Sequence, residues 1–255
     1  MLFTDIIYGP VHSRRLGISL GVNLLPLHSK LCNFDCIYCE CGWNKDNRAE
    51  KPLFNSRDDI RIALHATLER MKEEGALPDV ITFAGNGEPT IHPEFEGIIE
   101  DTIALRDKFA PQAKVSVLSN ATQLHREDVR RALRKVDNPI LKLDSAIDET
   151  AQLINKPCGN YSVKRVVEQL SAFGKEFVLQ TMFLRGEYNG TPIDNTTENE
   201  LLAWAAVVDH LRPRSVMVYS IDRATPCQTI EKISREELEK IAERVRALGI
   251  ECSAV

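Results

Sequence analysis

Three cysteines stand within eight residues of this chain, at Cys32, Cys36 and Cys39 in the spacing Cys-x3-Cys-x2-Cys. A loop this short can place three sulfurs around one face of a cubane cluster, but it cannot easily add a fourth ligand of the same kind. The spacing therefore indicates a [4Fe-4S] cluster held by three thiolates, with one iron open to a substrate or a cofactor. The aromatic side chain of Tyr38, just before the third thiol, is placed to cover that open position.

Two other interpretations of these thiols stay open at this point. A structural zinc site normally has four closed ligands in paired Cys-x2-Cys knuckles, and Cys41 would complete such a set in a cramped loop. Chance spacing of buried thiols is the second alternative. Disulfides are not expected, because the N-terminal residues lack the basic segment of a secretory signal and indicate a cytoplasmic protein whose thiols stay reduced.

The composition is that of an ordinary globular protein. Of the 255 residues, 43% are hydrophobic and 27% are charged, and no apolar run approaches the roughly 20 residues that a membrane helix needs. The net charge of −5 gives no general attraction to phosphate backbones, so nucleic acid is possible as a partner but not favoured. The pair Arg14-Arg15, close to His12, is a local basic candidate, although such a pair is usually solvated.

Short β-branched apolar runs alternate with longer amphipathic patterns along the chain, which predicts an α/β fold of βαβ units on a parallel sheet. A lead-in (1–17) precedes the first strand, and a long loop that carries the cysteines (24–51) follows it. We expect one domain over residues 1–255, with strands at 18–23, 80–84, 114–118, 139–144, 176–183 and 215–220. We expect helices at about 56–74, 95–108, 127–135, 163–173, 197–211 and 234–248, and a strand or tail at 251–255.

Polar residues and glycines follow the predicted strands at their carboxyl ends, where ligands bind in parallel α/β layers. Lys142 and Asp144 are two residues apart, so they share one face of a strand, and a charged pair on an inner face is costly unless it is paired or functional. The candidates at these ends are Gly85, Asn86, Gly87, Glu88, Asn120, Lys142, Asp144, Gln180, Arg185, Tyr219 and Asp222. Residues 185–195, rich in Gly and Asn, are expected to form a loop.

The cysteine motif with an aromatic residue before its last thiol resembles that of the radical S-adenosylmethionine (SAM) superfamily. The resemblance extends to Gly87-Glu88-Pro89, which matches the end of a Gly-Gly-Glu-Pro motif that binds the amino group of SAM, with Asn86 in place of one glycine. It implies a partial (β/α)6 barrel of parallel strands. It also implies cluster ligation by the three thiols and SAM contacts from Tyr38, Gly85, Asn86, Gly87, Glu88, Asn120, Asp144, Gln180 and Tyr219.

By the same resemblance, SAM would bind the open iron, and the reduced cluster would cleave SAM to a 5′-deoxyadenosyl radical that takes a hydrogen atom from a substrate. Lys142, Arg185 and Asp222 are the candidates for contacting that substrate, which would be a small molecule, a peptide or RNA. A flavodoxin or a ferredoxin would supply the electron.

Several alternatives for the function stay open. The segments 14–23 and 219–226 look like the branch of iron–sulfur oxidoreductases related to wybutosine-forming tRNA enzymes, and activation of a glycyl-radical partner is comparably open. A zinc or iron–sulfur regulatory module without turnover is the alternative of another class. The four remaining thiols, Cys41, Cys158, Cys227 and Cys252, are scattered, so buried structural roles are expected for them rather than a second cluster.

Overall fold

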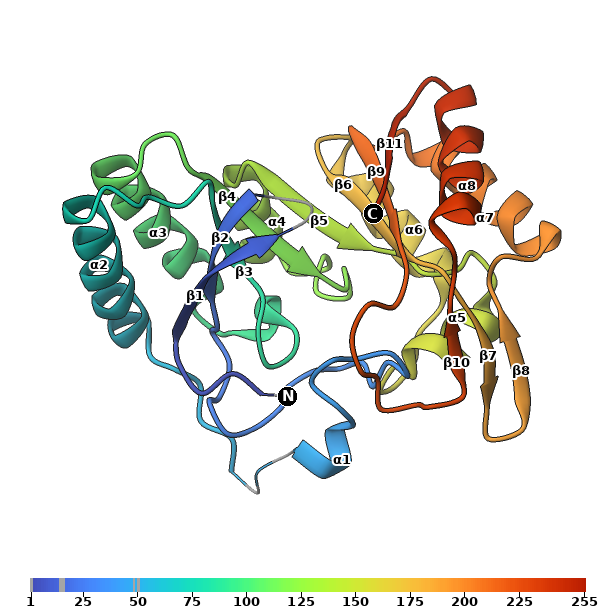
Figure 1. The fold of residues 1–255 in the computed structure, drawn as a ribbon, viewed down its shortest axis with the longest axis horizontal. Coiled ribbons are helices and arrows are strands. Elements are labelled where there is room, and N and C mark those ends of the chain that lie inside the picture. Colours follow the sequence, from blue (N-terminus) through green and yellow to red (C-terminus); the bar gives the residue numbers. More distant parts are fainter. Residues whose placement is uncertain (1, 14–16, 48, 50) are drawn as a thin grey trace. The chain divides into compact units, whose positions relative to one another are not determined.

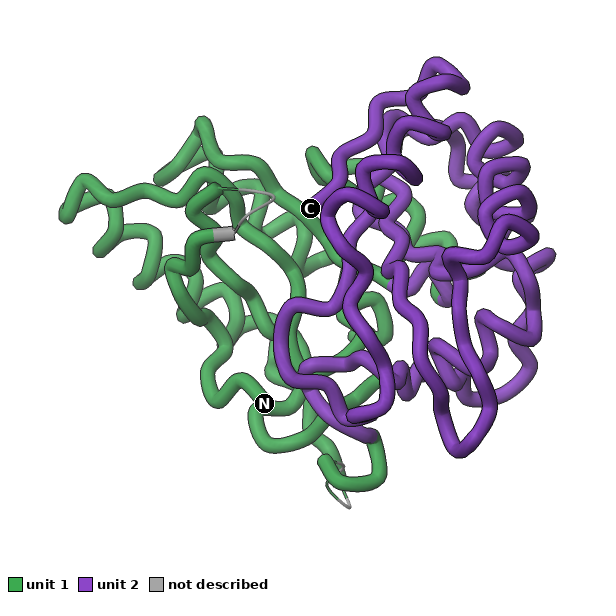
Figure 2. The backbone as a smooth tube through the Cα atoms, turned by 45° about the vertical axis from the view of Figure 1, so that its right-hand side comes forward, with its two compact units in different colours: residues 1–32, 44–119, 123–139 green, residues 33–43, 120–122, 140–255 purple. Residues whose placement is uncertain are grey.

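The computed structural model of the protein describes residues 2–13, 17–47, 49 and 51–255. The pair Arg14-Arg15 lies outside the described residues. The chain forms two compact units, with residues 1–32, 44–119 and 123–139 in the first and residues 33–43, 120–122 and 140–255 in the second (Figure 2). The boundary at residues 32 and 33 divides the cysteine motif between them. In the described part of the chain, no helix has the length and apolarity that crossing a membrane requires.

The first unit is built on four strands: β1 (Ile7–Ser13), β2 (Gly17–Val22), β3 (Val80–Phe83) and β4 (Lys114–Ser119). β1 pairs with β2 in the antiparallel sense, whereas β2, β3 and β4 are parallel to one another. The register aligns Val22, Phe83 and Val117 across three strands, and all three side chains are fully buried. The unit therefore has its own apolar core behind the strand ends that carry the candidate site.

Helices α1 (Asn44–Asn47), α2 (Arg57–Glu73), α3 (Phe95–Phe109) and α4 (Glu127–Lys135), with the short 3-10 helix η1 (Pro89–Ile91), complete the first unit. α2 begins at Ser56, whose side chain accepts a hydrogen bond from the backbone N–H of Asp59. The buried residues of α2 recur every three or four positions, so one face of the helix meets the core. α2 and α3 lie side by side (Figure 1), and an Arg57–Asp101 ion pair of 2.6 Å joins them.

The second unit contains four parallel strands in the order β5 (Asn138–Lys142, which enters the unit at Ile140), β6 (Val178–Met182), β9 (Ser215–Tyr219) and β11 (Glu251–Ala254). Its helices are α5 (Asp148–Asn155), α6 (Val163–Phe173), α7 (Glu198–Leu211) and α8 (Arg235–Ala247). Ser234 and Glu237 form a reciprocal capping box at the start of α8, as their spacing predicts. A separate antiparallel sheet consists of β10 (Ile230–Lys232), β7 (Leu184–Tyr188) and β8 (Thr191–Asp194).

The predicted series of six strands, each followed by a helix, is confirmed by β2, β3, β4, β5, β6 and β9. Three local expectations were wrong. The lead-in contains β1, an edge strand that accommodates Pro10 where its register shifts between Tyr8 and Val11. Residues 185–195 form the β7–β8 hairpin rather than a loop, and the cysteine loop 24–51 contains the short helix α1.

Candidate functional site

The segment Gly85-Asn86-Gly87-Glu88 follows β3 directly in the first unit. The carboxylate of Glu88 is buried, and its Oε1 accepts hydrogen bonds from the backbone N–H of Thr90 (3.1 Å) and from the hydroxyls of Thr90 (2.5 Å) and Ser119 (2.8 Å). Glu88 therefore ties the end of β3 to the end of β4. The contacts of this segment with SAM stay a prediction.

The side chain of Asn86 is fully buried and holds the N-terminal segment. Its Nδ2 donates to the carbonyls of Phe3 (2.9 Å) and Pro26 (2.8 Å), and its Oδ1 accepts the N–H of Phe3 (2.8 Å). The amide that stands in place of a glycine of the Gly-Gly-Glu-Pro motif thus ties the segment after β3 to Phe3 and Pro26. Sequence reasoning identified the departure at Asn86 but not this structural role, because it depends on contacts 60 and 83 residues away.

Gly87 allows the chain to approach the cysteine motif closely. Its φ is +139°, and a Cβ atom added there would lie 1.9 Å from the carbonyl oxygen of Leu31. Two backbone hydrogen bonds join the same partners, from Leu31 N–H to the Asn86 carbonyl (2.8 Å) and from Glu88 N–H to the Leu31 carbonyl (3.1 Å). Because Leu31 directly precedes Cys32, this contact fixes the position of the backbone where the cysteine motif begins.

The other two thiols of the motif, Cys36 and Cys39, belong to the second unit, and all three are partly buried. The backbone N–H of Cys39 donates to the carbonyl of Cys36 (3.1 Å), so the two cysteines flank one tight turn. None of the seven cysteines forms a disulfide. Among the described residues, no three His, Cys, Asp or Glu side chains gather closely enough to be recognised as a metal site.

The chemistry of the thiol pair is suited to a cationic iron centre. Burial and, after it, the charge of neighbouring Cys39 raise the pKa of Cys36 to about 12. Two adjacent thiolates are therefore unfavourable without a positive partner, and a bound metal ion deprotonates coordinating thiols outright. The donor set fits an iron–sulfur cluster, which thiolates hold.

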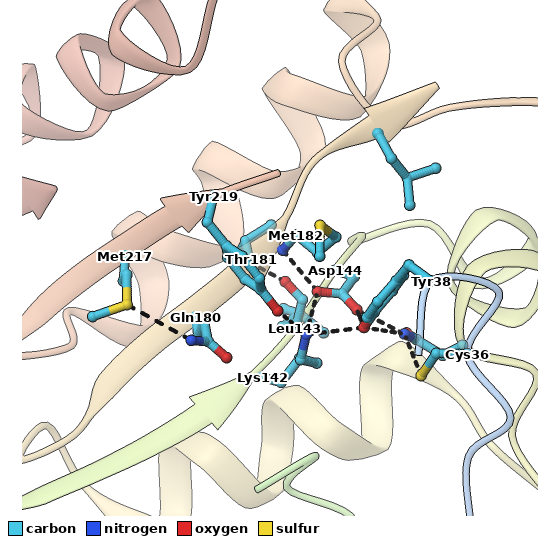
Figure 3. Close-up of polar contacts among 12 residues, drawn as sticks. Cys36, Tyr38, Lys142, Leu143, Asp144, Gln180, Thr181, Met182, Met217 and Tyr219 are labelled. Atoms are coloured by element: carbon cyan, nitrogen blue, oxygen red, sulfur yellow. Dashed lines mark hydrogen bonds and ion pairs between the residues drawn. The ribbon is translucent and has the colours of Figure 1, made fainter. Parts of the chain in front are cut away.

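Four side chains of the second unit form a buried polar network next to Cys36 (Figure 3). The hydroxyl of Tyr38 donates to Asp144 Oδ2 (2.5 Å), and Lys142 Nζ contacts Tyr38 Oη (2.9 Å), Tyr219 Oη (2.5 Å) and Asp144 Oδ1 (3.5 Å). The ammonium also lies over the Tyr38 ring at 4.7 Å and the Tyr219 ring at 5.0 Å. Lys142 thus has three oxygen partners within the protein.

The electrostatics of this network keep its lysine charged. Burial opposes the ammonium, but Asp144, Tyr219 and Cys36 outweigh burial, so the pKa of Lys142 is raised. Burial, followed by the charge of Asp144, raises the pKa of Tyr38 well above its usual range, so this phenol stays protonated and continues to donate. The predicted shared face of Lys142 and Asp144 is confirmed by their contact. The pair is internally neutralised rather than left as a buried charge.

Asn120 also lies beside the cysteine loop. Its Nδ2 donates to Asn33 Oδ1 (2.7 Å), while its Oδ1 accepts from the hydroxyl (2.7 Å) and backbone N–H (3.1 Å) of Thr122. The Asn33 amide in turn donates to the Thr122 hydroxyl (2.6 Å). The side chain thus connects the residue after Cys32 to the segment that follows β4 in the sequence, and its contact with SAM stays a prediction.

Three other candidates have partners of their own. Gln180 is buried on β6 and donates to the sulfur of Met217 (3.6 Å), a contact visible in Figure 3. Arg185, on β7, pairs with Glu237 (2.6 Å), and the exposed Asp222 pairs with Lys232 (3.2 Å). The roles of these residues toward SAM or a substrate stay predictions.

The thiols outside the motif follow the expected pattern in three of four cases. Cys41, Cys227 and Cys252 are buried, which confirms the structural burial predicted for them, whereas Cys158 is exposed.

Asn155, at the end of α5, is a site residue that sequence reasoning missed. Its amide contacts Asp144, Tyr38 and Cys36, and no motif surrounds it in the sequence that would have identified it.

Comparison with known proteins places this geometry in context. The family model described as the radical SAM superfamily matches residues 27–195, which include the cysteine motif and the strands from β3 to β8. The "UPF0026 protein slr1464" of Synechocystis is 32% identical over 228 residues, which is 87% of this chain and 77% of the relative. The "UPF0026 protein MJ1312" of Methanocaldococcus jannaschii is 32% identical over 76% of this chain and 59% of its own length.

A "GTPase Obg" of Brachyspira hyodysenteriae is 28% identical over 94% of this chain, which spans only 33% of that relative. Among solved structures, a radical SAM methyltransferase from Sphaerobacter thermophilus has a TM-score of 0.69 at 14% identity, covering 93% of this chain and 65% of its own. Streptococcus suis SuiB bound to S-adenosylmethionine has a TM-score of 0.62 at 16% identity, with 89% and 48% covered. The likeness shows the predicted fold, a partial (β/α)6 barrel.

The wybutosine-related branch is not confirmed. Archaeal TYW1 has a TM-score of 0.54 at 12% identity, covering 90% of this chain and 71% of its own. A likeness at that identity concerns the fold, which many enzymes of different substrates share. The two UPF0026 relatives carry no activity in their names.

Proposed function

The chain belongs to the radical SAM superfamily, and from this premise we propose that it is an enzyme that binds S-adenosylmethionine and in which Cys32, Cys36 and Cys39 hold a [4Fe-4S] cluster. The observation that carries the proposal is the motif itself, with thiols free of disulfides and with Cys36 and Cys39 set on one turn beside the Tyr38 network. When bound, the cluster would supply one-electron cleavage of S-adenosylmethionine for hydrogen-atom abstraction from a substrate.

The residues of the chain would position the cofactors. Gly87 brings the β3 end against Leu31, beside the first thiol, and the backbone of residues 85–88 would meet the amino group of SAM, because the side chains of Asn86 and Glu88 are engaged elsewhere. We propose, as the sequence predicts, that residues 1–255 work as one catalytic domain.

The second unit would supply a rigid wall beside the cluster. The hydroxyl of Tyr38 forms hydrogen bonds with Asp144 and Lys142, which lie outside the cysteine loop. These bonds fix its ring next to Cys36 and Cys39. Rigid support of this kind keeps reacting groups in place and limits access of water. A flavodoxin or ferredoxin is the proposed electron donor, as the resemblance implies.

The first test measures cluster binding. Purified under anaerobic conditions and reconstituted with iron and sulfide, the wild-type protein should hold about four irons and show a brown chromophore. Cys36→Ala should lose both the iron and the brown chromophore but retain its fold. Cys158→Ala is the matched control, because Cys158 is an exposed thiol outside the motif, and it should retain both. Full iron content in Cys36→Ala would refute the proposed ligand set.

A second experiment identifies the substrate. Deuterium-labelled small molecules, peptides and RNA would be incubated with the reconstituted protein, SAM and reductant. Transfer of deuterium into 5′-deoxyadenosine identifies the compound from which hydrogen is taken. RNA belongs in the panel because segments 14–23 and 219–226 resemble the wybutosine-related branch, although the net charge of −5 does not favour nucleic acid.

A further inference from the structure

Asn155 is the last residue of α5, and its side chain is almost completely buried. Its Nδ2 lies 2.7 Å from Asp144 Oδ2, 3.3 Å from Tyr38 Oη and 3.6 Å from the sulfur of Cys36. The contact with a carboxylate determines which end of the amide is the NH2 group, because the carbonyl oxygen would repel Asp144. One N–H is therefore directed at the carboxylate, and the other is available to the tyrosine oxygen and the sulfur.

Backbone contacts hold Asn155 against the cysteine loop independently of its side chain. The carbonyl of Asn155 accepts the N–H of Asp35 (3.0 Å), and the carbonyl of Ile154 accepts the N–H of Ile37 (3.0 Å). These two loop residues flank Cys36 on either side. The end of α5 is thus joined to the loop on both sides of the thiol, and shortening the Asn155 side chain would leave these bonds in place.

We infer that Asn155 is a positioning residue that donates an N–H···S hydrogen bond to Cys36 and thereby raises the reduction potential of the cluster. The inference rests on the proposed function, because it requires Cys36 to ligate iron. Hydrogen bonds to the sulfurs of an iron–sulfur cluster are among the features that set its potential. Ionised acceptors form stronger hydrogen bonds than neutral ones. Because the reduced cluster carries one more negative charge than the oxidised cluster, a hydrogen-bond donor to a ligating thiolate favours the reduced form.

The test is a redox titration of the reconstituted protein, followed by electron paramagnetic resonance. Asn155→Ala should hold as much iron as the wild type but should be reduced at a more negative potential. Asn195→Ala is the matched control: it removes another buried asparagine amide of the second unit, which donates to the carbonyls of Asp144 and Met182 rather than to a sulfur, so its potential should stay near that of the wild type. An unchanged potential in Asn155→Ala at full iron content would overturn the inference.

A second measurement covers the case in which Asn155→Ala does not hold the cluster. Wild-type protein made with asparagine labelled by 15N at the side-chain amide should show a 15N coupling to the reduced cluster in electron spin echo spectra, and its absence would overturn the inference. The two levels of failure are distinguishable. A wild-type protein that binds no iron contradicts the proposed function, whereas a loaded wild type with an unshifted variant contradicts the role of Asn155 alone.

Discussion

The substitution Gly87→Ala tests the link between β3 and the cysteine motif. The added Cβ would lie 1.9 Å from the Leu31 carbonyl oxygen, so that oxygen would have to retreat by about 1 Å to reach even the shortest contact that Cβ atoms make. The retreat would strain two backbone hydrogen bonds, Leu31 N–H to Asn86 and Glu88 N–H to Leu31. Each is worth about 1 kcal/mol.

A side chain at φ +139° adds a backbone penalty of about 1–3 kcal/mol. From the strained hydrogen bonds and the backbone penalty together, we expect the free energy of unfolding to fall by about 3–5 kcal/mol. Because Cys32 follows Leu31 directly, the variant should also bind substantially less iron than the wild type. The assays are urea unfolding of the protein without cluster, followed by circular dichroism, and iron quantitation after reconstitution.

Gly190→Ala is the matched control for this substitution. Gly190 also has a positive φ, +77°, but no heavy atom beyond the glycine and its two chain neighbours lies within 4 Å of the position that its Cβ would take. That variant should lose only about 1–2 kcal/mol and should bind iron normally. If Gly87→Ala were no more destabilised than Gly190→Ala and bound iron equally well, close packing of Leu31 on Gly87 would not be what positions the motif.

Three further substitutions test the supporting contacts. Tyr38→Phe removes a donor from a buried carboxylate that keeps other donors, so urea unfolding should show a loss of about 1–2 kcal/mol, and no loss would contradict the network. The hydrogen bond from Arg185, with further hydrogen bonds from Ser234 at the helix cap, lowers the pKa of Glu237 from 4.5 to about 2. The stability that this carboxylate contributes is therefore present above pH 4.5 and is lost as the pH falls through about 2. The stability difference between the wild type and Glu237→Gln should therefore be constant near neutrality and shrink below pH 4.5; a difference independent of pH down to 2 would refute the pairing. Asn86→Gly should release the N-terminal segment, seen as faster hydrogen exchange at the Phe3 amide, and unchanged protection there would show that Asn86 does not hold it.

The barrel strands were predictable because their signals are local. Buried runs such as Val80–Phe83 are short and apolar, and residues such as Ser56 mark helix starts that the structure retains. The β7–β8 hairpin also had a local signal that the prediction did not use. Asn189 and Gly190, both with positive φ, form the two-residue turn that an Asn-Gly pair favours.

The rest of the site depends on contacts between distant parts of the sequence. α5 begins at Ile147, which provides no side-chain cap, so nothing in the sequence marks its start. Asn155 meets Cys36 across 119 residues, and Tyr38 meets Asp144 across 106. A pattern of residue types can indicate that a buried Lys142–Asp144 pair needs partners, but only the fold shows that tyrosine hydroxyls are among those partners.

The most direct test of the central claim is cleavage of S-adenosylmethionine by the reconstituted wild-type protein. Under anaerobic conditions with dithionite, liquid chromatography with mass spectrometry should detect 5′-deoxyadenosine and methionine, and neither should form with Cys36→Ala. A wild-type protein that holds tightly bound zinc in place of iron, and that forms no 5′-deoxyadenosine, would contradict the account and would favour a metal-binding module without turnover.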